Sequence, residues 1–166
     1  GAAWVTVSSG EMNDGLYSWT VPVVDTDAAR VRVTASDLAG NTGEDSGDNP
    51  FIIDSSPPSV DITQPDTAGL YWAGGCLKSI AWAASDVSFG TGPITLEYSA
   101  DDGTSWMLAA AGEANDGLYS WTVPSLDTDI ARVRITAEDL AGNTTADMSG
   151  YPFTIDSSPP LLQLLD

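Results

Sequence analysis

The chain has 166 residues, 42% of them hydrophobic, which is enough for one large core or two small ones. Its net charge is −19, from 24 acidic and 5 basic residues, with no histidine. Because phosphate and anionic headgroups are bound by basic side chains, this charge argues against nucleic acid and anionic membranes as partners. The residues hold neither an apolar run long enough for a membrane span nor a basic-then-apolar leader. We therefore expect no membrane insertion here, and any secretion signal to lie outside this segment.

The excess of acidic residues has two possible interpretations. It keeps a protein soluble and apart from its copies, or its carboxylates collect divalent cations. Cys76 is the single cysteine, so no intrachain disulfide holds the fold together. We expect Cys76 to be a small, buried apolar side chain.

The chain is a tandem repeat. The decapeptide NDGLYSWTVP occupies residues 13–22 and again 115–124, an offset of 102 residues. The same offset aligns residues 1–64 with 103–166 without a gap, and 38 of the 64 aligned pairs are identical. A period near 100 residues is typical of one β-sandwich domain and too long for a solenoid unit.

The repeat predicts three segments. Residues 1–58 match only the second half of a repeat, 59–160 form one complete repeat, and 161–166 align with the start of a following one. We interpret the chain as a segment of a longer array of repeats, or as a unit that neighbouring repeats complete. The half repeat lacks counterparts of 60–99, so we expect its inward Trp19, Val31 and Val33 to face water.

Short runs of alternating polar and apolar residues predict strands and no helix. In ARVRITA, for example, Val133 and Ile135 share one face while Arg132 and Arg134 take the other, where we expect a cross-strand charge pair with Glu97. This pattern predicts two packed antiparallel sheets with aromatic side chains at the centre. The strands expected in the complete repeat are 60–63, 70–73, 77–84, 94–99, 106–110, 118–123, 131–138 and 151–155.

YSADDGTSW at 98–106 resembles the Asp-box of sialidase propellers and other secreted β-proteins. We interpret it as a structural hairpin turn. Asp101 accepts hydrogen bonds from turn backbone, Gly103 takes a positive φ, and Trp106 packs under the hairpin.

Several loops carry oxygen ligands at spacings that suit calcium. DTD contributes Asp127 and Asp129, and DLAGN contributes Asp139 and Asn143, although each loop is also an ordinary turn. IDSSPP places Asp54 and Asp156 at the two junctions, where paired prolines make a short, stiff linker. Our preferred metal hypothesis is calcium bound between repeats.

YSWTVP, ARVRITAEDLAGN and FTIDSSPP together resemble the bacterial immunoglobulin-like and fibronectin type III-like modules of very large secreted or surface proteins. The SSPPSVDIT and GGCLKSIAW segments are similar to the opening strands of such modules. The resemblance implies tandem immunoglobulin-like or fibronectin type III-like β-sandwiches, the first one incomplete. It also implies an extracellular, cell-surface location.

The expected function is a structural spacer or stalk repeat of a surface protein, adhesin or filament, with neighbouring repeats or subunits as partners. The chain has no histidine, no cysteine beside a base and no phosphate-binding glycine loop, so we expect no enzyme. Two alternatives stay open. One is a glycan- or host-surface-binding module with Trp72 as a stacking platform, and the other is a filament subunit completed by strand exchange.

Overall fold

The computed structural model describes residues 3–163, and these contain strands and no helix. The chain divides into two compact units, Gly1–Ser55 and Ser56–Asp166. Part of the predicted following repeat, residues 164–166, lies outside the described residues. No helix among the described residues is long and apolar enough to cross a bilayer.

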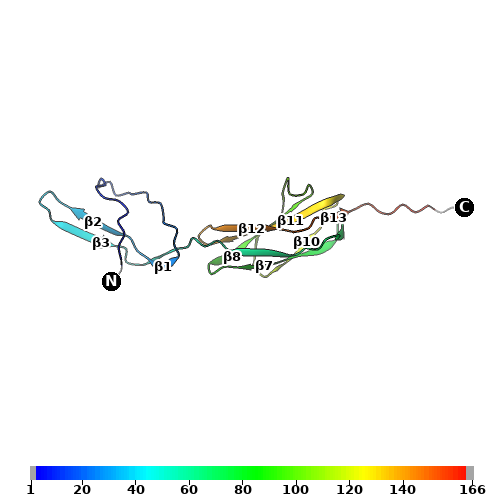
Figure 1. Cartoon of the computed structure of the whole chain (residues 1–166), viewed down its shortest axis with the longest axis horizontal. Helices are drawn as coiled ribbons and strands as arrows, with labels where there is room; N and C mark the ends of the chain where they lie inside the picture. Colours follow the sequence, from blue (N-terminus) through cyan, green and yellow to red (C-terminus); the bar gives the residue numbers. More distant parts are fainter. Residues whose placement is uncertain (1–2, 164–166) are drawn as a thin grey trace. The chain divides into compact units, whose positions relative to one another are not determined.

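The second unit is built from two sheets, one antiparallel and one mixed (Figure 1). One sheet has the order β10-β7-β5, and the other has the order β6-β13-β11-β8-β9, with β12 also paired to β11. The only parallel contact within these two sheets is the one between β6 and β13. The strands are β5 (Ser59–Gln64), β6 (Tyr71–Ala73), β7 (Leu77–Ser85), β8 (Phe89–Ser99), β9 (Met107–Glu113), β10 (Leu118–Thr122), β11 (Thr128–Asp139), β12 (Thr144–Met148) and β13 (Phe153–Asp156).

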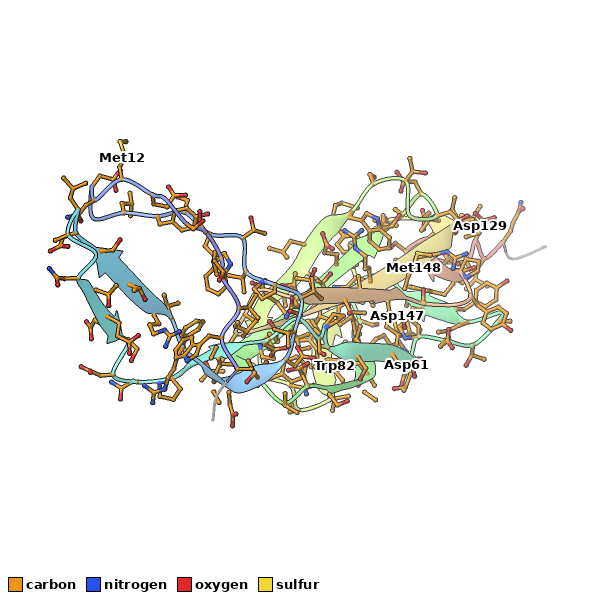
Figure 2. All side chains as sticks on the ribbon, turned by 60° about the vertical axis from the view of Figure 1, so that its left-hand side comes forward. Met12, Asp61, Trp82, Asp129, Asp147 and Met148 are labelled. Carbon is orange, nitrogen blue, oxygen red and sulfur yellow. The ribbon has the colours of Figure 1, made fainter. Side chains whose placement is uncertain are left out.

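Alternating residues of both sheets close one hydrophobic core. On β11, Ala131, Val133, Ile135 and Ala137 are all fully buried, as their alternation predicts. The opposite sheet contributes Trp82, which Figure 2 shows among the packed side chains of this unit. Two sheets that bury their facing side chains in this way form a β-sandwich. The other members of the core are Ile62, Trp72, Ile80, Ile94, Leu96, Trp121, Val123, Phe153 and Ile155.

The outward face of β11 carries the expected charge pair. Arg134 lies directly opposite Glu97 of β8, and its Nη2 is 2.6 Å from Glu97 Oε2. The guanidinium also stacks over the ring of Trp106 at 4.3 Å. Arg132 pairs elsewhere, with Asp102, and donates to the carbonyl of Ser149 at 2.6 Å.

The first unit repeats part of this pattern. It contains β1 (Thr26–Ala29), β2 (Arg32–Ser36), β3 (Thr42–Ser46) and β4 (Phe51–Ile53). Its pairs Thr26↔Ile53 and Arg32↔Ser46 reproduce the pairs Thr128↔Ile155 and Arg134↔Met148 of the second unit at the offset of 102. Residues 26–53 therefore adopt the same strand register as residues 128–155.

The first unit does not bury its apolar side chains. Val31 and Val33 are exposed, Trp19 is half-buried, and Met12 projects from the backbone (Figure 2). Ile53 is the one hydrophobic residue counted as buried among residues 3–55. The expectation that this half repeat leaves its inward face open is confirmed for Val31 and Val33, and only partly for Trp19.

Two expectations for the second unit were wrong, those for residues 144–148 and for Cys76, while Trp72 packs in the core and does not fit the alternative of a sugar-stacking platform. Residues 144–148 form β12, a strand that the sequence did not predict. Cys76 is exposed, because it lies in the turn between β6 and β7. Trp72 is buried, because pairing with β13 places its ring against Phe153, with centroids 4.8 Å apart. A buried ring cannot be a platform for sugar stacking.

Candidate functional site

The DLAGN loop at the end of β11 is organised by one buried carboxylate. Asp139 Oδ1 accepts hydrogen bonds from the backbone N–H groups of Ala141 and Asn143, both at 2.8 Å. The amide Nδ2 of Asn143 donates to Asp139 Oδ2, also at 2.8 Å. Burial alone would raise the pKa of Asp139, but these hydrogen bonds outweigh it and hold the pKa below its usual value. Asp139 is therefore an anion held in a fixed pose.

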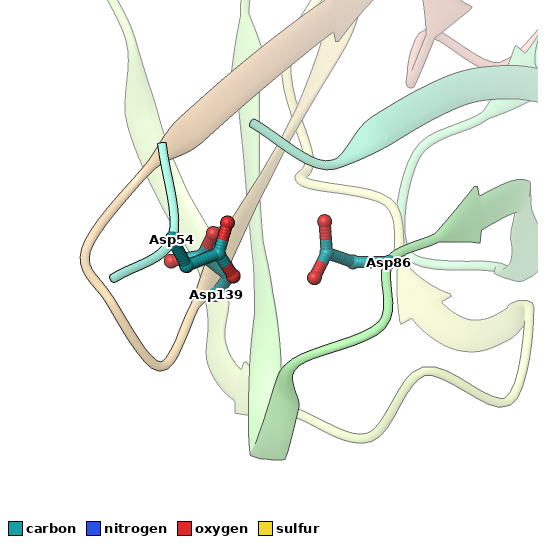
Figure 3. A group of neighbouring side chains, drawn as sticks. All are labelled: Asp54, Asp86 and Asp139. Carbon is teal, nitrogen blue, oxygen red and sulfur yellow. The ribbon is translucent and has the colours of Figure 1, made fainter. Parts of the chain in front are cut away.

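Asp86 lies beside Asp139 at the same end of the second unit. It follows the last residue of β7, and its Oδ1 accepts hydrogen bonds from the N–H and the hydroxyl of Ser88. Carboxylate oxygens of Asp86 and Asp139 lie within 4.8 Å of each other, and Figure 3 draws both side chains. Two carboxylates this close repel each other unless a cation lies between them, and oxygen donors are what calcium prefers.

Asp86 was missed by the sequence analysis. The available signal was positional: Asp86 directly follows a strand whose final residue, Ser85, pairs with Ser59 at the start of β5. It therefore sits at the end of the second unit that the inter-repeat linker enters.

The opposite end of the second unit carries a separate group of carboxylates. Asp127, Asp129 and Asp156 line a shallow hollow of about 410 Å³, together with Thr128, Thr154, Ile155 and Ser158. Asp127 accepts from the N–H of Ser157 at 2.6 Å and from the hydroxyl of Ser158 at 2.9 Å. The first of these bonds contributes most to lowering the pKa of Asp127.

The predicted ligands therefore fall into two groups rather than one site. Asp127, Asp129 and Asp156 gather where β11 begins, and Asp139 and Asn143 gather where it ends. β11 has 12 residues, and a strand of that length spans roughly 35 Å. Because calcium–oxygen distances are only about 2.4 Å, the two groups of one repeat cannot hold the same ion.

The first unit holds copies of both loops. Asp37 accepts from the N–H groups of Ala39 and Asn41, both at 2.9 Å, as Asp139 does in the second unit. Asp25 accepts from the N–H of Ser55 at 2.7 Å, as Asp127 does from Ser157. Asp54 is the copy of Asp156 and follows β4 directly.

Neither kind of comparison places the chain in a family. No protein-family model matches it, and no curated protein matches its sequence.

The segment that resembles the Asp-box forms a turn closed by its own hydrogen bonds. Asp101 accepts from the N–H of Ser105 at 2.8 Å and from its hydroxyl at 2.6 Å, and the buried Ser99 hydroxyl donates to Asp101 at 2.7 Å. Gly103 has a φ of 84°, and a Cβ there would lie 3.3 Å from the Trp106 ring. The polar groups of Asp101 and Ser99 hydrogen-bond within the turn itself, which is the arrangement that the interpretation as a structural hairpin turn predicts.

Proposed function

We propose that this chain carries spacer repeats of an extracellular array, in a surface protein, adhesin or filament, and that calcium stiffens the junction between repeats. The observation that carries the proposal is the recurrence of strand register and loop hydrogen bonds at an offset of 102 residues. An array in which the same unit recurs needs each unit to have the same two ends, and the two copies share the loop of Asp25 and Asp127 and the loop of Asp37 and Asp139.

The sandwich itself we propose to be immunoglobulin-like or fibronectin type III-like. The support is the division of its strands. β5, β7 and β10 pair in one sheet, while β8, β11 and β12 pair in the other. This is the partition of strands A, B and E against C, F and G that characterises such domains.

The calcium proposal rests on the carboxylates that lie at each end of the complete repeat. The outgoing end carries three carboxylates, Asp127, Asp129 and Asp156, and the incoming end carries Asp86 and Asp139. Tandem linkage joins the outgoing end of one repeat to the incoming end of the next. At the junction within this chain, the linker carboxylate that we propose to take part is Asp54.

A calcium titration of the full chain tests this proposal, with calorimetry and small-angle scattering as readouts. An ion that binds only the folded state stabilises it by about 2.7 kcal/mol at a hundred times its dissociation constant. We expect the melting temperature to rise with calcium and to fall back with EDTA. If neither the melting temperature nor the radius of gyration changes when EDTA is added, the calcium proposal is refuted.

The repeat supplies a matched control for the titration. Asp54→Asn and Asp156→Asn change the same residue in the same IDSSPP context, but only Asp54 lies at the junction between the two units. We expect Asp54→Asn to weaken the calcium response and Asp156→Asn to leave it unchanged. Equal effects of the two substitutions would contradict a junction site.

A further inference from the structure

β10 lies at a free edge of the second unit. It pairs with β7 along all of its residues without a bulge, and no described strand pairs with its other side. Gly117 and Val123, which flank β10, both make main-chain hydrogen bonds on the β7 side. Because such bonds alternate along an antiparallel pair, the N–H and C=O groups of Ser120 and Thr122 point away from β7. This edge can therefore accept another strand.

The other edges of the same unit are protected in ways that β10 is not. In β5, the N–H of Ile62 is bonded to Asp147 of β12 at 2.7 Å, and a register shift interrupts the strand. β9 has two register shifts against β8 and carries Glu113, while β6 has only three residues. β10 reads LYSWT, with no charge, proline or bulge. Since these are the devices that prevent edge-to-edge pairing in natural sheets, β10 is the edge left open to it.

The surface around β10 is uncharged in a strongly acidic chain. The outward residues of β10 are Leu118, Ser120 and Thr122, and the residues opposite them on β7 carry no charge either. Leu118 is 57% exposed, and Leu77 of β7 is 68% exposed. Two molecules that each carry a net charge of −19 repel each other, so they can approach closely only where both are uncharged. The β10 edge meets that condition.

The outward residues of β10 are unchanged between the two repeats. They belong to the decapeptide 115–124, which is the longest run that the repeats share letter for letter. Exposed residues elsewhere in the repeat have changed: Leu108, Ala146 and Met148 correspond to Thr6, Glu44 and Ser46. Packing of the core explains why Tyr119 and Trp121 are kept, but it does not explain an exposed leucine. A contact made by the outer side of β10 does.

We propose that β10 is the contact through which two molecules of this protein associate, pairing edge to edge and antiparallel about a two-fold axis at Ser120. This register sets Leu118 of one molecule opposite Thr122 of the other and uses every main-chain group that faces the open side. The Leu118 N–H, now bonded to Asp116 Oδ1 at 3.1 Å, would exchange that partner. The antiparallel direction also keeps the two Asp116 carboxylates at opposite ends of the contact, which a parallel pair would not.

The chemistry of β10 favours a second molecule of the same protein over another partner. A two-fold contact needs only one surface, provided that this surface is complementary to itself. Here serine meets serine at the axis, and leucine meets threonine on either side, so no like charges face each other. The three-stranded sheet β10-β7-β5 would then continue from one molecule into the other.

Pairing through one repeat should be weak. β10 has 5 residues, and a contact of this size falls below the roughly 1,200 Å² of stable complexes. We expect a dissociation constant on the order of 0.1–1 mM. In an array, the same edge recurs in every repeat, and linked contacts strengthen one another. That use rests on the proposed array function, whereas the pairing itself does not.

Sedimentation equilibrium of the full chain tests the pairing, at concentrations from about 20 μM to about 1 mM. EDTA and a reductant are present throughout, so that neither bound calcium nor a disulfide through Cys76 can join the molecules. We expect the average mass to rise toward that of a dimer. Hydrogen exchange of the Ser120 and Thr122 amides should slow over the same range of concentration.

Charge exchange at the axis tests the register. Ser120→Asp and Ser120→Lys should each weaken association at least about tenfold, because each sets like charges opposite one another. An equimolar mixture of the two variants should associate again, since opposite charges then meet. Ala146→Asp is the matched control. It adds the same charge on β12, where the other repeat already carries Glu44, and it should leave association unchanged.

Three results would overturn the proposal: a mass that stays monomeric at every concentration, slowed exchange confined to other strands, or a mixture that associates no better than its components. Thermal unfolding checks that each variant folds. If a Ser120 variant does not, Thr122→Asp mixed with Leu118→Lys tests the same register. A monomer with an intact calcium response would leave the spacer proposal standing, and a dimer without a calcium response would leave the pairing standing.

Discussion

Trp121 is a side chain whose removal should destabilise the second unit strongly. Its ring lies edge-on to Trp72 at 6.1 Å and tilted to Tyr98 at 5.3 Å, and it is almost fully buried. We expect Trp121→Ala to lower the free energy of unfolding by about 3 kcal/mol, measured by urea denaturation of the full chain. Trp19→Ala changes the same residue of the repeated decapeptide and should cost the second unit almost nothing. Equal losses would contradict the difference in packing.

Asp101 should make the stability of the second unit depend on acid pH. Donation from the Ser105 hydroxyl, then from its N–H and from the Ser99 hydroxyl, lowers the pKa of Asp101 from 3.8 to about 2. Because the folded state favours the anion, this contribution is complete above pH 3.8 and is lost as the pH falls toward 2. Between pH 5 and pH 2, the melting temperature should therefore fall less steeply for Asp101→Asn than for the unsubstituted chain. If the melting temperatures of the two chains fall in parallel with pH, Asp101 is not the source of the acid sensitivity.

The loop after β11 should be a stabilising element in one copy only. Asp139 is buried and bonds to Ala141 and Asn143, while Asp37 makes the same bonds in an exposed loop. Removing a buried acceptor leaves its donors unpaired, which costs roughly 1–3 kcal/mol. We expect Asp139→Ala to lower the melting temperature of the second unit and Asp37→Ala to leave it unchanged. A shift of similar size in both variants would show that burial is not the cause.

Alternation predicted the strands that face the core and failed where a strand faces water. Residues 131–138 carry an apolar residue at every second position, and β11 follows that pattern. β12 reads TTADM, with half-buried and exposed positions only, so its strand character comes from pairing with β11 rather than from its own composition. The sequence therefore indicated the sheets but undercounted their strands.

The same limit explains the incomplete prediction of the acidic site. Asp139 and Asn143 were recognised because they lie four residues apart in one loop. Asp86 is distant in sequence, and it meets Asp139 because β7 and the β8–β11 pair end on the same side of the sandwich. The pairing of the strands must be known before a residue such as Asp86 can be predicted to lie near Asp139.

As a whole, the first 58 residues should not fold alone. Their described strands pair two by two, and their apolar side chains stay exposed, so little burial offsets the entropy of ordering the chain. We expect a polypeptide of residues 1–58 to show no cooperative transition by circular dichroism on heating. Cooperative unfolding as a monomer would contradict the assignment of this segment as half a repeat.

Native-state hydrogen exchange of the full chain tests the central claim most directly, because the two copies report on each other. The claim is that residues 26–53 and 128–155 share one strand register and differ in whether a core covers them. We predict that the amides of Val133 and Ile135 exchange only through global unfolding, while those of Val31 and Val33 exchange orders of magnitude faster. Equal protection of the matched residues in the two copies would contradict the claim.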